Sequence, residues 1–163
     1  QYNKLGELNN WSFHSDDAKH FLGTNTEQFD LIWDDIPPAR SRQIALTYTQ
    51  EFFRLVKARL SERGLFSLPS LIPLDSRSAY GKKMIATMAS VFDKYFVLQY
   101  GNTAYFFGGL ASMPDYDKET LRRAIDHSGK AEVQIFLQDE VNAQVRGVDV
   151  ITIDNMADLI YDE

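Results

Sequence analysis

The sequence predicts a three-layer α/β fold whose sheet is mostly parallel and ends in an antiparallel hairpin. Strand-like and helix-like hydrophobic patterns alternate along the first 92 residues, as in chains that build parallel sheets. Two aromatic-rich runs, residues 96–100 and 105–110, are then joined by a short Gly-Asn-Thr turn of the hairpin type. With 163 residues, of which 44% are hydrophobic, the chain is long enough for one domain with a real core.

The first part of the chain contains two predicted strands and a short helix. Residues 11–14 form a strand candidate, and Asp16 or Asp17 then stands where it can cap a helix that runs to about Leu22. Residues 29–33 form an apolar run that one aspartate interrupts and a proline-containing loop follows. Such a run is typical of a parallel strand that is buried on both faces.

A long helix, a strand and a second long helix are expected next. Between residues 48 and 63 the apolar positions recur at helical spacing, and Gly64 follows as a C-terminal stop. Residues 65–68 then read as the next strand, and residues 76–92 as the second helix.

The character of the chain changes after residue 112. We interpret residues 1–112 as the main domain and residues 113–163 as an acidic appendage packed on the same domain. The elements predicted in the appendage are a helix at 117–127, strands at 132–137 and 148–153, and a last short helix at 154–160 that Asp154 caps.

Composition and charge exclude several classes of function. Residues 138–163 hold seven acids and one arginine, and so carry the whole net charge of −6. An acidic chain lacks the basic surface that nucleic acids require, so we expect no nucleic-acid partner. The sequence has no cysteine and no apolar run of the roughly 18 residues that a membrane span needs, which favours a cytoplasmic chain.

Pairs of acids follow the first two predicted strands. Asp16 and Asp17 follow residues 11–14, and Asp34 and Asp35 follow the next strand. Ligands of parallel α/β sheets bind at the carboxyl ends of the strands, where a carboxylate can bind an adenine amine or a ribose hydroxyl, or hold and deprotonate an ammonium group. The alternative is structural, with the first pair capping a helix and the second pair solvating a loop.

Other recurrent site motifs are absent from the sequence. The three histidines have no metal-ligand spacing, so we expect no metal site. No two glycines form a GxG motif, and there is neither a P-loop nor a nucleophile elbow. The sequence therefore offers no glycine-rich loop for a phosphate or a nucleoside cofactor.

Four segments carry a resemblance to a known family: SDDAKHFL (15–22), FDLIWDD (29–35), TYTQEFFRLVKARLSERGLF (47–66) and YGNTAYFFGGLAS (100–112). In this order they resemble the C-terminal half of the catalytic domain of the spermidine/spermine synthases, the polyamine aminopropyltransferases. The resemblance is closest to the branch in which this domain is fused behind membrane helices. It implies a methyltransferase-like, Rossmann-type sheet that lacks its first two strands.

The resemblance also implies roles for individual residues. Asp17, with Asp16 beside it, matches the acid that contacts the adenine of decarboxylated S-adenosylmethionine, and Asp35 matches the acid that helps to deprotonate the attacking amine. Tyr48 and Asp34 fall in the substrate pocket. The family usually has a second acid shortly after the strand-end aspartate, whereas this chain has Ile-Pro-Pro-Ala at residues 36–39.

The expected function is that of a spermidine synthase-like domain of polyamine biosynthesis. A complete domain transfers an aminopropyl group from decarboxylated S-adenosylmethionine to putrescine, but this chain alone is expected to bind no cofactor and to be inactive. We expect a homo-oligomer, or completion by an N-terminal cofactor-binding or membrane region of the same gene product. The alternatives are a fragment of an S-adenosylmethionine-dependent methyltransferase-like enzyme and a non-catalytic scaffold or regulatory relative.

Overall fold

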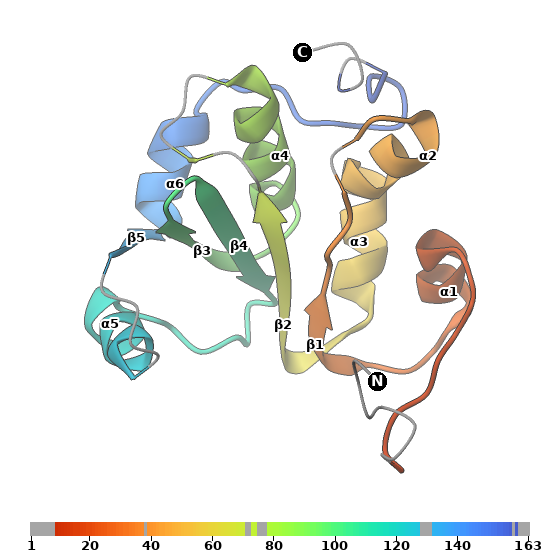
Figure 1. Ribbon diagram of the computed structural model, residues 1–163, viewed down its shortest axis with the longest axis horizontal. Coiled ribbons are helices and arrows are strands. Elements are labelled where there is room, and N and C mark those ends of the chain that lie inside the picture. Colours follow the sequence, from red (N-terminus) through yellow and green to blue (C-terminus); the bar gives the residue numbers. More distant parts are fainter. Residues whose placement is uncertain are drawn as a thin grey trace, which may run out of the picture.

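The protein folds around a five-stranded sheet with the strand order β1-β2-β4-β3-β5 (Figure 1). The computed structural model describes residues 9–37, 39–70, 73–74, 78–127, 132–157 and 159. In chain order its elements are α1 (Ala18–Thr24), β1 (Phe29–Trp33), α2 (Arg42–Ala45), the 3-10 helix η2 (Leu46–Tyr48), α3 (Gln50–Ala58), β2 (Leu60–Ser70), α4 (Ala79–Ala89), β3 (Lys94–Tyr100), β4 (Thr103–Gly109), α5 (Lys118–Asp126), β5 (Val133–Leu137) and α6 (Gln138–Val145).

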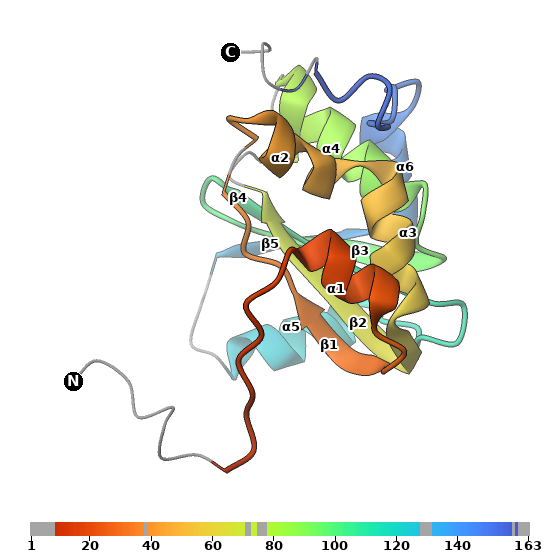
Figure 2. The same cartoon turned by 90° about the vertical axis from the view of Figure 1, so that its right-hand side faces the viewer.

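Helices cover both faces of the sheet, so the predicted three-layer α/β architecture is confirmed. Figure 2 shows α3, α4 and α6 on one side of the sheet and α5 on the other. The main core lies under the first group and contains the fully buried Phe53, Phe66 and Phe106. A smaller core lies under α5, where Leu121 packs with Phe96 of β3 and Ile135 of β5.

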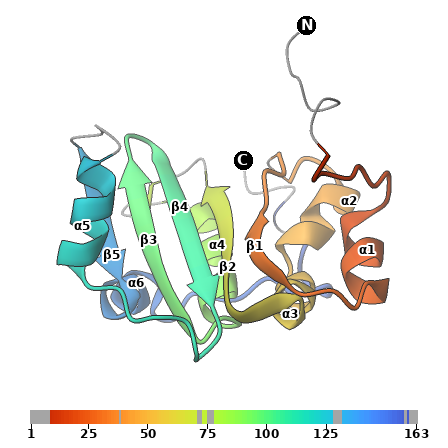
Figure 3. The ribbon, with the colours of Figure 1, turned by 90° about the horizontal axis from the view of Figure 1, so that it is seen from below.

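The sheet is mixed, with one parallel pair and three antiparallel pairs among the described strands (Figure 3). β1 runs parallel to β2, whereas β3 and β4 form the predicted antiparallel hairpin, which turns at Gly101 with a φ of 56°. β5 adds a further antiparallel strand beside β3. The parallel part of the sheet is smaller than expected. β2 has the β3–β4 hairpin on one side, so its only parallel neighbour among the described strands is β1, which lies at the edge.

The strand predicted at residues 11–14 does not form. This segment has no regular secondary structure and pairs with no described strand, and the side chains of Trp11 and Phe13 are 44% and 78% exposed. An isolated strand leaves its backbone groups without the hydrogen bonds of a ladder. The prediction was wrong because a local pattern says nothing about whether a neighbouring strand exists.

The boundary between α3 and β2 also differs from the prediction. α3 ends at Ala58, and Leu60, which was expected in the helix, is the first residue of β2 and pairs with Phe29. Gly64 is not a helix stop but lies inside β2, where the strand carries extra residues opposite Phe29 and Leu31. The spacing between Val56 and Leu60 matches a helix only by coincidence. The side chain of Leu60 is buried, but it reaches the core from β2 and not from α3.

Replacing Gly64 by alanine should lower the free energy of unfolding by about 1–3 kcal/mol. A Cβ atom at Gly64 would lie 2.7 Å from the backbone oxygen of Phe29, so the two strands would have to move apart. Gly23→Ala is the matched control, since a Cβ there meets nothing within 4 Å and alanine favours the helix. Urea unfolding of both variants checks this, and equal stabilities would contradict it.

The last part of the chain contains a helix that the prediction missed and lacks a strand that it expected. α6 follows β5 directly, and the side chain of Glu140 accepts the backbone N–H of Leu137 at its start, at 2.9 Å. Residues 148–153 form no strand, because the backbone of Ile151 bonds to Gln50 N and Thr87 Oγ1 of the helices. Residues 153–157 form turns, and 158 and 160 of the last predicted helix lie outside the described residues.

Among the described strands, β1 forms one edge of the sheet. It is the first strand in the order and pairs only with β2 among them, and two large side chains on it, Leu31 and Trp33, are 57% and 53% exposed. Unpaired edges with apolar side chains recruit other strands unless charges block them. The expectation of a homo-oligomer therefore stays a prediction. No helix in the described ranges is both long enough and apolar enough to cross a membrane.

Light scattering at tens of micromolar should give a mass above the 18.7 kDa of one chain. Leu31→Lys should lower this mass, because lysine on an edge strand opposes strand pairing. Tyr100→Lys is a suitable control, since Tyr100 is 49% exposed but belongs to β3, which is paired on both sides. A monodisperse 18.7 kDa species for the unmodified chain would contradict association through this edge.

Candidate active site at the carboxyl end of β1

Two consecutive acids lie at the carboxyl end of β1. The backbone N–H of Asp34 donates to the carbonyl oxygen of Ser67 in β2 at 2.9 Å, so Asp34 continues the parallel ladder just beyond Trp33. The side chain of Asp34 is buried, with 9% of the residue exposed, whereas Asp35 is exposed to solvent. The two neighbouring carboxylates therefore have very different environments.

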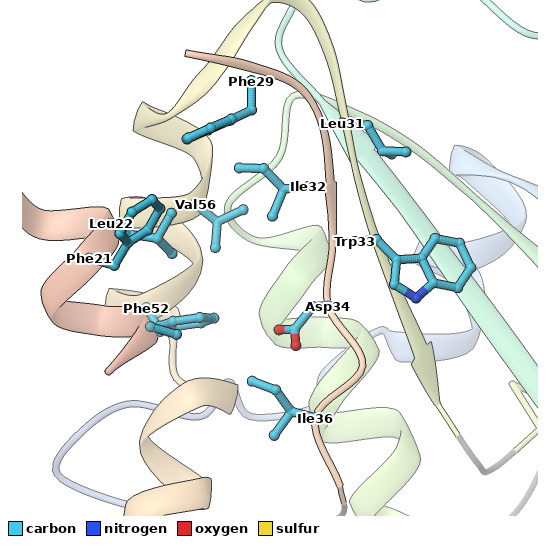
Figure 4. Close-up of a pocket in the computed structure, with 11 residues that line it drawn as sticks. Phe21, Leu22, Phe29, Leu31, Ile32, Trp33, Asp34, Ile36, Phe52 and Val56 are labelled. Atoms are coloured by element: carbon cyan, nitrogen blue, oxygen red, sulfur yellow. The ribbon is translucent and has the colours of Figure 1, made fainter. Parts of the chain in front are cut away.

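A pocket of about 350 Å³ lies between α1, β1 and α3. Figure 4 shows the carboxylate of Asp34 on the side of β1 that faces α3, near Phe52 and Ile36, while Leu31 and Trp33 project from the other side of the strand. The lining is apolar except for Asp34 and consists of Ala18, Phe21, Leu22, Phe29, Leu31, Ile32, Trp33, Ile36, Phe52 and Val56 around it.

Burial raises the pKa of Asp34 to about 7. The backbone N–H of Ile36 lowers the pKa by hydrogen bonding, and the neighbouring charge of Asp35 raises it. The oxygen Oδ2 of Asp34 has no hydrogen-bond partner among the described residues. This carboxyl group can therefore exchange a proton near neutral pH, and its buried Oδ2 atom has unused capacity to accept a hydrogen bond.

Tyr48 fixes the loop that carries the strand-end acids. Its buried hydroxyl donates a hydrogen bond shared between the carbonyl oxygens of Ile36 and Pro37, at 2.9 Å from each. Burial raises the pKa of Tyr48, and Tyr80 and the two acids add to this shift. The hydroxyl of Tyr80 accepts the backbone N–H of Ala39 at 3.3 Å. Two phenol groups thus hold this loop from within the protein.

Tyr48→Phe should lower the free energy of unfolding by about 1–2 kcal/mol, because two buried carbonyl groups lose their donor. Tyr116→Phe is a matched control, since the ring of Tyr116 packs edge-on against Phe96 on the other face of the sheet. Thermal unfolding of both variants measures the difference. A Tyr48→Phe variant as stable as the control would show that the hydroxyl does not fix the loop.

The acids before α1 have structural partners. The Oδ1 atom of Asp17 accepts the backbone N–H of His20 at 3.1 Å, so Asp17 caps α1 as the structural alternative predicted. The Oδ2 atom of Asp16 lies 2.7 Å from Nδ1 of His20, and this contact lowers the pKa of Asp16 and raises that of His20. Ala18, directly after the cap, lines the pocket.

The structure brings only part of the predicted site into the pocket. Asp34 lines it, whereas Asp35, Asp17 and Tyr48 are not among its lining residues. Sequence reasoning did not predict the apolar wall of the pocket. The helical spacing of Phe52 and Val56 on α3 was the one pattern that could have indicated it. The described residues contain no group of three or more acids and histidines that could hold a metal ion.

Comparisons with known proteins give a local relative and several similar folds. No family model matches the sequence. Over 64 residues, 39% of this chain and 12% of the relative, the chain is 31% identical to a polyamine aminopropyltransferase of Oceanobacillus iheyensis. The chain thus matches a small part of that curated relative.

Two solved structures are similar in fold. A probable spermidine synthase from Corynebacterium glutamicum ATCC 13032 superimposes with a TM-score of 0.65 at 20% identity, over 85% of this chain and 53% of that chain. A spermidine synthase in complex with the transition state analogue AdoDATO gives a TM-score of 0.50 at 20% identity, over 80% of this chain and 46% of that chain. The chain spans about half the length of these two structures.

Proposed function

We propose that this chain, which is a spermidine synthase-like domain, supplies the amine-binding half of a site for aminopropyl transfer. In this reaction a neutral amino group of putrescine attacks the methylene carbon beside the sulfonium of decarboxylated S-adenosylmethionine. A C–N bond forms, the C–S bond breaks, and the nucleoside leaves as the thioether methylthioadenosine. The attacking nitrogen gives its proton to a carboxylate.

The observation that carries this proposal is the pair of carboxylates at the carboxyl end of β1. Ligands of parallel α/β sheets bind at this end of the strands, so the pair stands where a substrate amine would arrive. Asp35 is exposed and adjoins the buried Asp34, and the hydroxyl of Tyr48 holds the loop that follows them. A fixed loop supports catalysis because the reacting atoms must stay within attack distance.

We assign the roles accordingly. Asp35 holds the substrate amine and accepts its proton, and Asp34 lines the adjoining pocket with its buried carboxylate. Tyr48 does not line the pocket itself, and its role is to position the loop after β1 through its hydroxyl group. Asp17 contacts the adenine with Asp16 beside it, and the capping bond of Asp17 orients its carboxylate at the start of α1.

Apart from Asp17 and Asp16, the nucleoside side of the site is proposed to lie outside this chain. The sequence contains no GxG motif for a nucleoside, and β1 has an open edge beside which further strands can pair. Decarboxylated S-adenosylmethionine is therefore expected as the co-substrate of a complete domain and not as a ligand of these 163 residues. For the same reason we expect no turnover from the chain by itself.

An assay with decarboxylated S-adenosylmethionine and putrescine tests this function. This chain completed by a nucleoside-binding part, in the same polypeptide or in a second one, should form spermidine, and residues 1–163 alone should form none. Spermidine formation by the 163-residue chain would contradict the proposal that the site is divided. Failure of the completed domain to form spermidine, with both reactants at millimolar concentration, would overturn the proposed function.

A further inference from the structure

We propose that the pocket between α1, β1 and α3 binds a monoamine with an apolar body, whose ammonium group pairs with Asp34. This inference goes beyond the proposed transfer reaction, because the chain holds this site by itself and no nucleoside is needed. The ligand class follows from two features of the pocket, its apolar wall and its single carboxylate, whose Oδ2 atom has no hydrogen-bond partner among the described residues.

The wall of the pocket suits an alkyl or arylalkyl chain. The residues that line the pocket include Phe21 and Leu22 of α1, Phe52 and Val56 of α3, and Ile32 of β1 (Figure 4). The volume of about 350 Å³ is larger than a six-carbon chain requires. Transfer of such a chain from water into this apolar space is favourable in proportion to the area that it buries.

The carboxylate of Asp34 supplies the polar end of the site. The residue is 91% buried, since 9% of it is exposed, and its Oδ2 atom has no hydrogen-bond partner among the described residues. Buried polar atoms in folded proteins nearly always have a partner, so an oxygen without one beside a pocket is a candidate acceptor for a ligand. An ammonium group can donate to this oxygen and neutralise its charge at the same time.

The ionisable groups around Asp34 favour a positive ligand. Asp35 next to it is an acid, and Tyr48 under the loop, with Tyr80 beyond it, is a neutral phenol whose hydroxyl already has acceptors. No lysine, arginine or histidine is among the described residues that line the pocket. A cation that enters the pocket therefore meets no competing positive charge.

The charged side chains on the two helices that wall the pocket mostly bond elsewhere. The pairs are His20 with Asp16, Asp17 with the backbone of His20, Glu51 with the backbone of Ile153, Arg54 with Gln50, and Lys57 with Asp93. These side chains therefore have partners outside the pocket. Lys19, the remaining charged residue of α1, does not line the pocket. Asp34 remains the acid that a ligand inside the pocket can reach.

A single buried carboxylate selects monoamines over diamines. A diamine that pairs one ammonium with Asp34 must place its second ammonium in the apolar wall or leave it in solvent. Burying an unpaired charge is costly, and leaving it outside withdraws the carbon chain from the pocket. The pocket should therefore prefer hexylamine to putrescine.

Protein NMR with hexylamine as the probe tests the proposal on the chain as it exists. Backbone amides of Ile32 and Val56 should shift on titration. The affinity should rise about tenfold or more between pH 5.5 and pH 8, because Asp34 must lose its proton to pair with the ligand, while the alkylamine stays protonated throughout. Putrescine should bind at least about tenfold more weakly than hexylamine.

Two variants and one neutral ligand make the test specific. Asp34→Asn should remove the pH dependence and weaken hexylamine binding, whereas Asp35→Asn should leave the pH dependence in place. Hexan-1-ol, which has no charge, should show no rise in affinity with pH. The proposal would be overturned by absence of binding at tens of millimolar, by equal binding of putrescine, or by an unchanged pH dependence in Asp34→Asn. None of these outcomes bears on the proposed transfer reaction, because the binding experiment contains no nucleoside and the reaction is tested by its own assay.

Discussion

Asp34→Asn should raise the free energy of unfolding at pH 8 by about 2–4 kcal/mol. Burial raises the pKa of Asp34 to about 7 from the usual 3.8, so the folded protein opposes the ionisation that the unfolded chain undergoes freely. The unmodified protein should therefore lose stability as the pH rises from about 4 to about 7. Asparagine has a similar shape and cannot ionise, so the variant avoids this loss.

The sign and the pH window make this prediction specific. Below pH 4 the carboxyl group is protonated in both the folded and the unfolded state, so wild type and variant should be equally stable there. The difference should grow up to about pH 7 and stay constant above it. Urea unfolding at several pH values measures it, and Asp35→Asn, at an exposed site, is the matched control. A variant that is less stable than wild type at pH 8 would show that the ionised carboxylate is stabilised by groups that have not been identified.

In a domain completed by a nucleoside-binding part, Asp35→Asn should lower kcat with putrescine by about two to four orders of magnitude, the range that follows the loss of a general base. The amide cannot take the proton that the attacking nitrogen releases. Folding should be unaffected because the side chain of Asp35 is exposed. Steady-state kinetics with both substrates saturating give the comparison.

The control for this variant is a distant exposed acid. Asp126→Asn at the end of α5, on the other face of the sheet, should leave kcat unchanged. Unchanged turnover in Asp35→Asn would remove Asp35 from the mechanism and favour its alternative role as a solvated loop acid. A similar loss in both variants would point to a general effect of charge rather than to a proton acceptor.

Local patterns predicted the elements that local interactions stabilise. α1 begins where the sequence places a capping side chain, because an oxygen of Asp17 accepts the backbone N–H of His20 within the same turn. α4 and α5 begin within three residues of their predicted starts, at Ala79 and Lys118. The β3–β4 hairpin was also predicted, since its Gly-Asn turn specifies the reversal of the chain. These features depend on residues that are close in the sequence.

Elements that depend on distant partners were predicted less well. Residues 11–14 and 148–153 have strand-like patterns, but the first finds no neighbouring strand and the second bonds to the ends of helices. Leu60 extends a helical pattern and yet belongs to β2, because pairing with Phe29 decides its conformation. Sequence spacing does not contain this information.

The candidate site was predicted in position but not in environment. The sequence indicated acids at the carboxyl end of a strand, and Asp34 and Asp35 are found there. It could not show that the carboxylate of Asp34 is buried beside an apolar pocket while that of Asp35 is exposed to solvent. That difference depends on how α1 and α3 pack against β1, which no local pattern specifies.

The identity of the nucleoside product tests the central claim most directly. The domain completed by a nucleoside-binding part should be given equal concentrations of decarboxylated S-adenosylmethionine and S-adenosylmethionine, with putrescine as the acceptor, and the products should be separated by mass. An aminopropyl-transfer domain should form methylthioadenosine and spermidine in equal amounts and no S-adenosylhomocysteine. S-adenosylhomocysteine with a methylated amine would contradict the account in favour of a methyltransferase, and no product from either donor would favour a scaffold.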